Sequence, residues 1–205
     1  MKKNNLIRFA QSLVLLPMIT SPLALGSIQS IEASPSVLVQ KINIEAGSTI
    51  TLNKVTDTEA ELLKAKAEAI DAYFSDRDMP LAGMGIKMVE EAEKNGLDWR
   101  LLPAIAVRES TGGKFACKKA TFNPFGWGSC KIGFKSNEHA IEIVAKNLGG
   151  NNPNTARHYE DKDTKVILRA YNPPSIAPRY AEQVMNIMNT IGPANLGTVE
   201  ALAKS

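Results

Sequence analysis

The chain has 205 residues, of which 44% are hydrophobic and 22% are charged, and its formal net charge is +3. This composition is ordinary for a globular protein and excludes wholesale disorder. Three basic residues and no acidic residue fall within residues 1–26, so the remainder of the chain has a net charge of about zero. That balance removes the main support for a nucleic-acid-binding protein.

Residues 1–26 have the pattern of a secretory signal peptide. A basic start is followed by an apolar stretch, and Ala24 and Gly26 are small residues at the −3 and −1 positions of a cleavage site. Prolines interrupt the apolar stretch and make it a poor membrane-spanning helix, although an uncleaved anchor is the alternative. We therefore expect a secreted protein, in the periplasm or at the cell wall, whose N-terminal segment could contact the membrane transiently.

Residues 27–56 form a separate region in which apolar and polar residues partly alternate. The alternation is compatible with a small β-hairpin or with a spacer ahead of the main domain. The following residues, Thr56 to Glu59, fit a capping box that starts a helix. That helix would bury a stripe of residues spaced three and four apart, namely Leu63, Ala67, Ile70 and Phe74.

We expect the main domain to span residues 57–192 and to be mainly α-helical. Ser136 is the predicted cap of one helix, and residues 193–205 are expected to form a flexible tail. Further helices are predicted at about residues 82–94, 97–113, 136–148, 164–171 and 177–191.

The helix predicted over residues 97–113 carries one glutamate at the end of an apolar stripe. Helical spacing places Ile105, Ala106 and Glu109 on one face, while Pro103 is tolerated only near the first turn. A carboxyl group that loses water there favours its protonated form, and a protonated carboxyl can act as a general acid. The alternative is a glutamate at a helix end that simply reaches solvent.

The loop from Lys114 to Lys135 contains several lysines, four phenylalanines and a tryptophan, but no acidic residue. Asn-Pro and Gly-Trp-Gly sequences predict tight turns within it. Aromatic faces suit the apolar faces of sugar rings, so we expect Phe125 and Trp127 to line a cleft. Phe115 and Phe134 are expected to pack in the interior instead.

Cys117 and Cys130, the only cysteines, both lie in this loop. An even cysteine count in a secreted chain predicts one disulfide, which would contribute about 3 kcal/mol in the chain-entropy model. Neither His139 nor His158 stands at ligand spacing from the cysteines, so we expect no metal and no cofactor.

Several motifs occur in a fixed order: Glu109-Ser110 at a helix end, Asn123-Pro-Phe-Gly126-Trp127, residues 134–141, and Tyr171-Asn172 within Leu-Arg-Ala-Tyr-Asn-Pro. Together they resemble the lysozyme-like superfamily of peptidoglycan-cleaving enzymes. The first three are most similar to the glucosaminidase family, also called mannosyl-glycoprotein endo-β-N-acetylglucosaminidase-like. The last resembles the Ala-Tyr-Asn motif of lytic transglycosylases. The resemblance covers about residues 70–191.

The resemblance implies a lysozyme-like helical domain with a disulfide-pinned loop or small β element beside a cleft. It implies cleavage of β-1,4 bonds between N-acetylglucosamine and N-acetylmuramic acid, with peptidoglycan glycan strands as partner, a monomeric chain and Glu109 as the general acid. The substrate-binding residues that it implies are Ser110, Asn123, Phe125, Gly126, Trp127, Tyr171 and Asn172.

Glycosidases usually employ two carboxylates, but no acidic residue stands at a convincing spacing from Glu109. Glu138 falls in the first turn of a helix, and Glu160, Asp161 and Asp163 fall in a later loop. The substrate's own N-acetyl or 6-hydroxyl group can replace the second carboxylate, as the resemblance implies for lytic transglycosylases. A hydrolase is favoured; the alternatives are a transglycosylase giving 1,6-anhydro products, a wall-glycan-binding module, and a helical protein that binds another protein.

Overall fold

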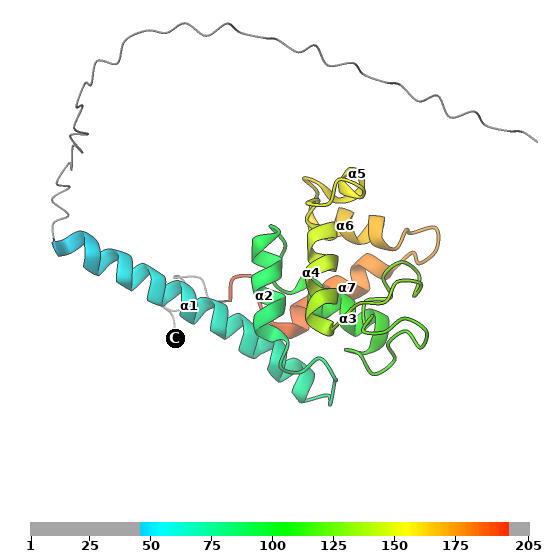
Figure 1. The fold of residues 1–205 in the computed structure, drawn as a ribbon, viewed down its shortest axis with the longest axis horizontal. Helices are drawn as coiled ribbons and strands as arrows, with labels where there is room; N and C mark the ends of the chain where they lie inside the picture. The colour runs from blue at the N-terminus through cyan, green and yellow to red at the C-terminus, as the bar shows by residue number, and fades with distance from the viewer. Residues whose placement is uncertain (1–45, 197–205) are drawn as a thin grey trace, which may run out of the picture. The chain divides into compact units, whose positions relative to one another are not determined.

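The computed structural model describes the backbone of residues 46–196 and the side chains of residues 58–196. No strand occurs in residues 46–196, so the predicted mainly helical class is confirmed and the small β element is not found there. The predicted signal peptide lies outside the described residues. The helices are α1 (Ala46–Ser75), α2 (Gly85–Lys94), α3 (Leu101–Ser110), α4 (Asn137–Leu148), α5 (Ala156–Tyr159), α6 (Thr164–Tyr171) and α7 (Tyr180–Ile191) (Figure 1).

Helix α1 begins earlier than the sequence predicted. It starts at Ala46 rather than after Thr56, so the end of the expected spacer or hairpin is helical, while residues 27–45 lie outside the described residues. A capping residue contributes only about 1 kcal/mol, and no proline precedes Thr56 in this stretch to stop the helix. No helix among the described residues is long and apolar enough to cross a membrane.

The C-terminal half of α1 packs against α2. The apolar stripe predicted that this part of α1 would be buried. Ala67, Ile70 and Phe74 are buried. The contact is close: a Cβ on Gly85 would lie 2.3 Å from the carbonyl oxygen of Ala67. Asp71 fixes the start of α2 by accepting hydrogen bonds from the amides of Gly83 and Gly85, at 2.8 and 2.9 Å.

Helix α3 is the centre of the domain, and it packs against α7. Its residues Leu101, Leu102 and Ala104 to Ala106 are fully buried. Pro103 lies in the first turn as expected, where its missing N–H is not needed. The helix begins four residues later than predicted and ends at Ser110, followed by the C-cap residue Thr111, which has a left-handed backbone (φ 52°).

Helices α4 and α6 follow the sequence predictions closely. The Ser136 hydroxyl accepts from the amide of His139 at 3.2 Å and so caps α4, whose apolar stripe is buried. Helix α6 has the predicted bounds, but the short α5 was not predicted.

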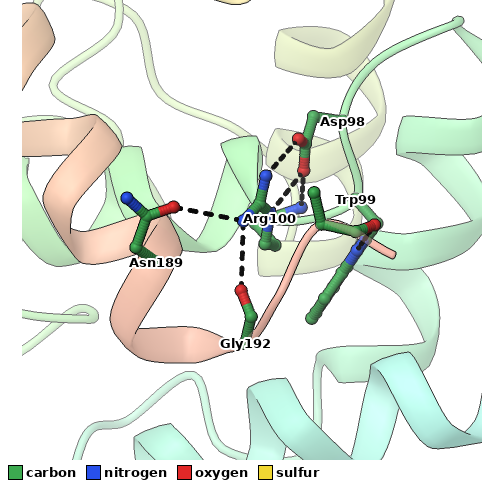
Figure 2. A network of polar contacts seen from close by, with 6 residues as sticks. Asp98, Trp99, Arg100, Asn189 and Gly192 are labelled. Carbon is green, nitrogen blue, oxygen red and sulfur yellow. Dashed lines mark hydrogen bonds and ion pairs between the residues drawn. The ribbon is translucent and has the colours of Figure 1, made fainter. Parts of the chain in front are cut away.

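A network of polar contacts joins the start of α3 to the segment after α7 (Figure 2). The buried guanidinium of Arg100 bonds the carboxylate of Asp98 at 2.7 Å and donates to the carbonyl of Gly192 at 3.0 Å. The indole N–H of Trp99 donates to the carbonyl of Ala194 at 3.4 Å. Residues 193–196, the start of the expected flexible tail, are held by such contacts, and residues 197–205 lie outside the described residues.

Candidate active site

The loop after α3 is tied by the predicted disulfide. Cys117 and Cys130 are bonded, with their Cα atoms 5.5 Å apart. Within the ring that they close, the buried side chain of Asn123 accepts from the amide of Trp127 at 3.0 Å and donates to the carbonyls of Trp127 and Ile132, both at 2.9 Å. Asn123 was expected to contact substrate; in this structure its polar atoms hold the turn together and it has no exposed surface.

Ser110 connects the end of α3 to the same turn. Its buried hydroxyl lies 2.6 Å from the carbonyl oxygen of Pro124, to which it donates, and it accepts from the amide of Gly113 at 2.9 Å. Ser110 was also expected to bind substrate; in this structure its hydroxyl is buried and is bonded to the loop instead. Its role is to fix the turn beside the neighbouring Glu109.

The phenylalanines of the loop are distributed differently from the prediction. Phe125 is fully buried in the core instead of lining a cleft, and its carbonyl accepts a hydrogen bond from the Tyr171 hydroxyl. Phe134 is buried as expected, whereas Phe115 is 76% exposed. Phe125, directly after Pro124, and Phe134 therefore anchor the loop in the core.

Glu109 is half-buried at the end of α3, between α7 and the Asn123–Trp127 turn. Its Oε1 accepts from the hydroxyl of Tyr180 at 2.6 Å. Its Oε2 faces Gly126, where an added Cβ would lie only 2.9 Å away. No ion pair within the described residues involves Glu109, and the hydrogen-bond partner of its carboxylate is a phenol.

Two tyrosines stack beside Glu109. The rings of Tyr171 and Tyr180 lie 5.9 Å apart at 12°. Burial, reinforced by the charge of Glu109, raises the pKa of both hydroxyls far above the usual range. Both phenols therefore stay neutral and act as hydrogen-bond donors. Tyr180 was not among the predicted site residues; the signal that could have identified it is that a buried tyrosine hydroxyl needs a partner.

A pocket of about 470 Å³ opens beside Gly126. The Trp127 ring lies 5.7 Å from the ring of Tyr171 and 6.5 Å from that of Tyr159, so aromatic faces dominate its wall. Four predicted site residues, Gly126, Trp127, Tyr171 and Asn172, line it together. Glu109 does not line this pocket itself and adjoins it through Gly126.

No second carboxylate of residues 58–196 bonds or pairs with a group that Glu109 contacts. Asp163 caps α6 by accepting from the amide of Val166 at 2.9 Å, and Glu160 and Asp161 are exposed. Glu138 is also exposed, and a hydrogen bond with Ser136 lowers its pKa. Within the described part of the chain no group of three His, Cys, Asp or Glu side chains could hold a metal ion.

No protein-family model, no curated protein and no solved structure matches this chain. The functional interpretation therefore depends on the residues themselves. Glu109 at the end of α3 is bonded to a phenol and stands next to an aromatic pocket, and part of that pocket's wall comes from a loop held by a disulfide.

Proposed function

We propose that the protein cleaves the glycan strands of peptidoglycan at β-1,4 bonds between N-acetylglucosamine and N-acetylmuramic acid. Glu109 is the general acid. The observation that carries this proposal is the position of its carboxylate, which is bonded to the neutral hydroxyl of Tyr180 and adjoins the aromatic pocket through Gly126.

The surroundings of Glu109 suit an acid that gives up a proton. Oε1 accepts the Tyr180 hydrogen bond, which leaves Oε2 on the side of Gly126. Oε2 is therefore the oxygen that donates a proton to the glycosidic oxygen as the bond breaks. The Tyr180 hydroxyl stabilises the carboxylate that forms, because a hydrogen bond to a charged acceptor is stronger than one to a neutral acceptor.

The absence of a second carboxylate beside Glu109 in the described residues favours participation by the substrate. An N-acetyl or 6-hydroxyl oxygen of the sugar attacks the anomeric carbon in place of an enzymatic nucleophile. Attack by the N-acetyl group followed by water gives hydrolysis, which we favour, and attack by the 6-hydroxyl gives a 1,6-anhydro sugar. The pocket beside Gly126 has a volume typical of ligand sites, and its aromatic walls suit sugar rings.

Digestion of purified peptidoglycan, followed by mass spectrometry of the soluble products, tests this function. We expect fragments whose new ends are N-acetylglucosamine, for a glucosaminidase, or 1,6-anhydro-N-acetylmuramic acid, for a transglycosylase. Glu109→Gln should abolish their release, while the exposed Glu138→Gln serves as the matched control. More than about a tenth of wild-type turnover in a folded Glu109→Gln protein would reject Glu109 as the acid.

One observation favours a non-catalytic alternative, a wall-glycan-binding module: Glu109 itself does not line the aromatic pocket. In that case the wild-type protein would co-sediment with peptidoglycan and release no fragment. Trp127→Ala would then weaken sedimentation, while Glu109→Gln would leave it unchanged.

A further inference from the structure

Tyr180, which bonds Glu109, also lines a second pocket. This pocket has a volume of about 330 Å³ and is lined by Arg108, Arg179, Gln183 and residues 177–178 as well as Tyr180. It receives its residues from the end of α3 and the start of α7. Nothing in the sequence pattern pointed to it, because the two arginines are 71 positions apart, the same separation as Glu109 and Tyr180.

Arg108 is held in place within this pocket. Its Nε donates to Oε1 of Gln183 at 3.0 Å, and its guanidinium carbon lies 5.7 Å from the centre of the Tyr180 ring. No hydrogen bond or ion pair within residues 58–196 occupies the two terminal nitrogens. A guanidinium fixed at Nε with both terminal nitrogens free can bind a carboxylate through two parallel hydrogen bonds.

Arg179 brings a second unpaired guanidinium to the same pocket, and no ion pair of the described residues involves it. The nearest acid in sequence, Glu182, is engaged elsewhere: it pairs with Lys165 at 3.3 Å, and its pKa is lowered by hydrogen bonding and by the charges of Lys165 and Arg169. The pocket is therefore positively charged and lacks an internal anion.

We propose that this pocket is a carboxylate-binding subsite that positions the glycan strand beside Glu109. The inference rests on the proposed function, since the ligand is a carboxylate of the same polymer. Peptidoglycan offers two sources: the lactyl carboxylate of N-acetylmuramic acid, free where the peptide has been removed, and the carboxylates of the stem peptide. Uncharged N-acetylglucosamine oligomers offer neither.

Binding measured in the Glu109→Gln background tests the subsite without cleavage. Each of three ligands is added to the protein, and binding is followed by the change in tryptophan fluorescence. The ligands are glycan strands bearing peptides, strands freed of peptides by an amidase, and chitotetraose. Arg108→Gln and Arg179→Gln should each raise the dissociation constant of a carboxylated strand about tenfold and leave that of chitotetraose unchanged. Arg169→Gln, which removes an exposed charge outside the pocket, should change neither.

The strand that loses affinity identifies the source of the carboxylate. A loss confined to peptide-free strands assigns the lactyl group, and a loss confined to peptide-bearing strands assigns the stem peptide. Equal losses on chitotetraose and on the carboxylated strands, or no loss on any ligand, would overturn the subsite. Arg179 makes no side-chain hydrogen bond among the described residues, so its replacement tests the subsite even if Arg108→Gln fails to fold.

The binding result and the function can fail separately. If the wild-type protein releases no fragment from peptidoglycan while the arginine variants still lose affinity for carboxylated strands, the enzymatic proposal falls and the subsite stands. If wild-type cleavage occurs and the arginine variants cleave carboxylated strands with unchanged KM, the subsite falls and the enzyme stands.

Discussion

Two glutamates of this domain, Glu91 and Glu109, are removed from solvent in opposite ways. Glu91 on α2 is 5% exposed, and its carboxylate lies 2.8 Å from the ammonium of Lys87 and 3.5 Å from that of Lys94. Glu109 is half-buried and is bonded to the neutral phenol of Tyr180. Glu91, the more buried of the two, is therefore the one that forms ion pairs with lysines.

The partners of Glu91 determine its charge. Burial alone raises the pKa of a carboxyl, but the hydrogen bond and the charge of Lys87, with help from Lys94, hold the pKa of Glu91 below its usual value. Glu91 is thus a fixed anion that ties neighbouring turns of α2. Burial therefore does not distinguish the proposed general acid from the structural carboxylate of Glu91; the type of partner does.

The largest expected difference is in turnover, between the variants in which Glu109 or Glu91 is replaced by glutamine. Glu109→Gln removes the proton donor and should lower turnover on peptidoglycan at least 100-fold, because general acid catalysis contributes about 10²–10⁴-fold. Glu91→Gln should leave turnover within about twofold of wild type, since α2 contributes no residue to either pocket beside Glu109. Initial rates of product release, on proteins with wild-type circular dichroism, measure both; equal losses would refute the division of roles.

A smaller effect is expected from the glycine that adjoins Glu109. Gly126 has φ 64°, and an added Cβ would lie 2.9 Å from Oε2 of Glu109. Gly126→Ala should displace the carboxylate and lower turnover about 10- to 100-fold. Gly96→Ala is the matched control, because Gly96 has φ 67° and open space around its Cβ position. Both variants should lose similar thermal stability; similar losses of activity as well would mean that backbone strain, not contact with Glu109, is responsible.

Removal of the Tyr180 hydroxyl should have a moderate effect. Tyr180→Phe keeps the ring stacked on Tyr171 but removes the hydrogen bond to Oε1 of Glu109. A hydrogen bond to a charged group contributes about 1.5–3 kcal/mol, so kcat should fall about 10- to 100-fold at nearly unchanged KM. Tyr159→Phe, which alters a phenol of the pocket wall that does not bond Glu109, should change kcat less than threefold.

The smallest effect concerns stability alone. Because the pKa of Glu91 is lower in the folded protein than in the unfolded chain, its ion pairs stabilise the fold above the ordinary glutamate pKa of about 4.3 and lose that contribution as the pH falls through the folded value. Glu91→Gln should therefore lower the free energy of unfolding by about 1–2 kcal/mol at pH 7. Denaturant titrations should show this gap closing below about pH 4; a gap that persists into acid would mean that packing, not charge, is lost.

The helices were largely predictable because their signals are local. The Ser136 cap, the apolar stripe of α4 and the bounds of α6 follow from spacing and capping within one element. Helix α5 was missed because four residues carry no periodicity. The start of α1 was missed because a capping box marks where a helix can begin and does not forbid an earlier beginning.

The site was less predictable, because it depends on contacts between elements. Spacing brought Glu109 to the end of a buried face, and the resemblance indicated the Asn123–Trp127 turn. Which side chains of that turn face inward is decided by Ser110 and Asn123, whose polar atoms bond backbone atoms of the loop instead of a ligand. Tyr180 joins Glu109 from 71 positions away, a distance that no local pattern spans.

The network of polar contacts between the start of α3 and the segment after α7 also sets an order of events during synthesis. Arg100 and Trp99 find their partners, the carbonyls of Gly192 and Ala194, 92 and 95 positions later in the chain. A chain that emerges N-terminus first cannot close this junction, or bury the Arg100 charge with its final partners, until residues 192–194 have been synthesised. The central helix α3 therefore completes its contacts only after α7 has formed behind it.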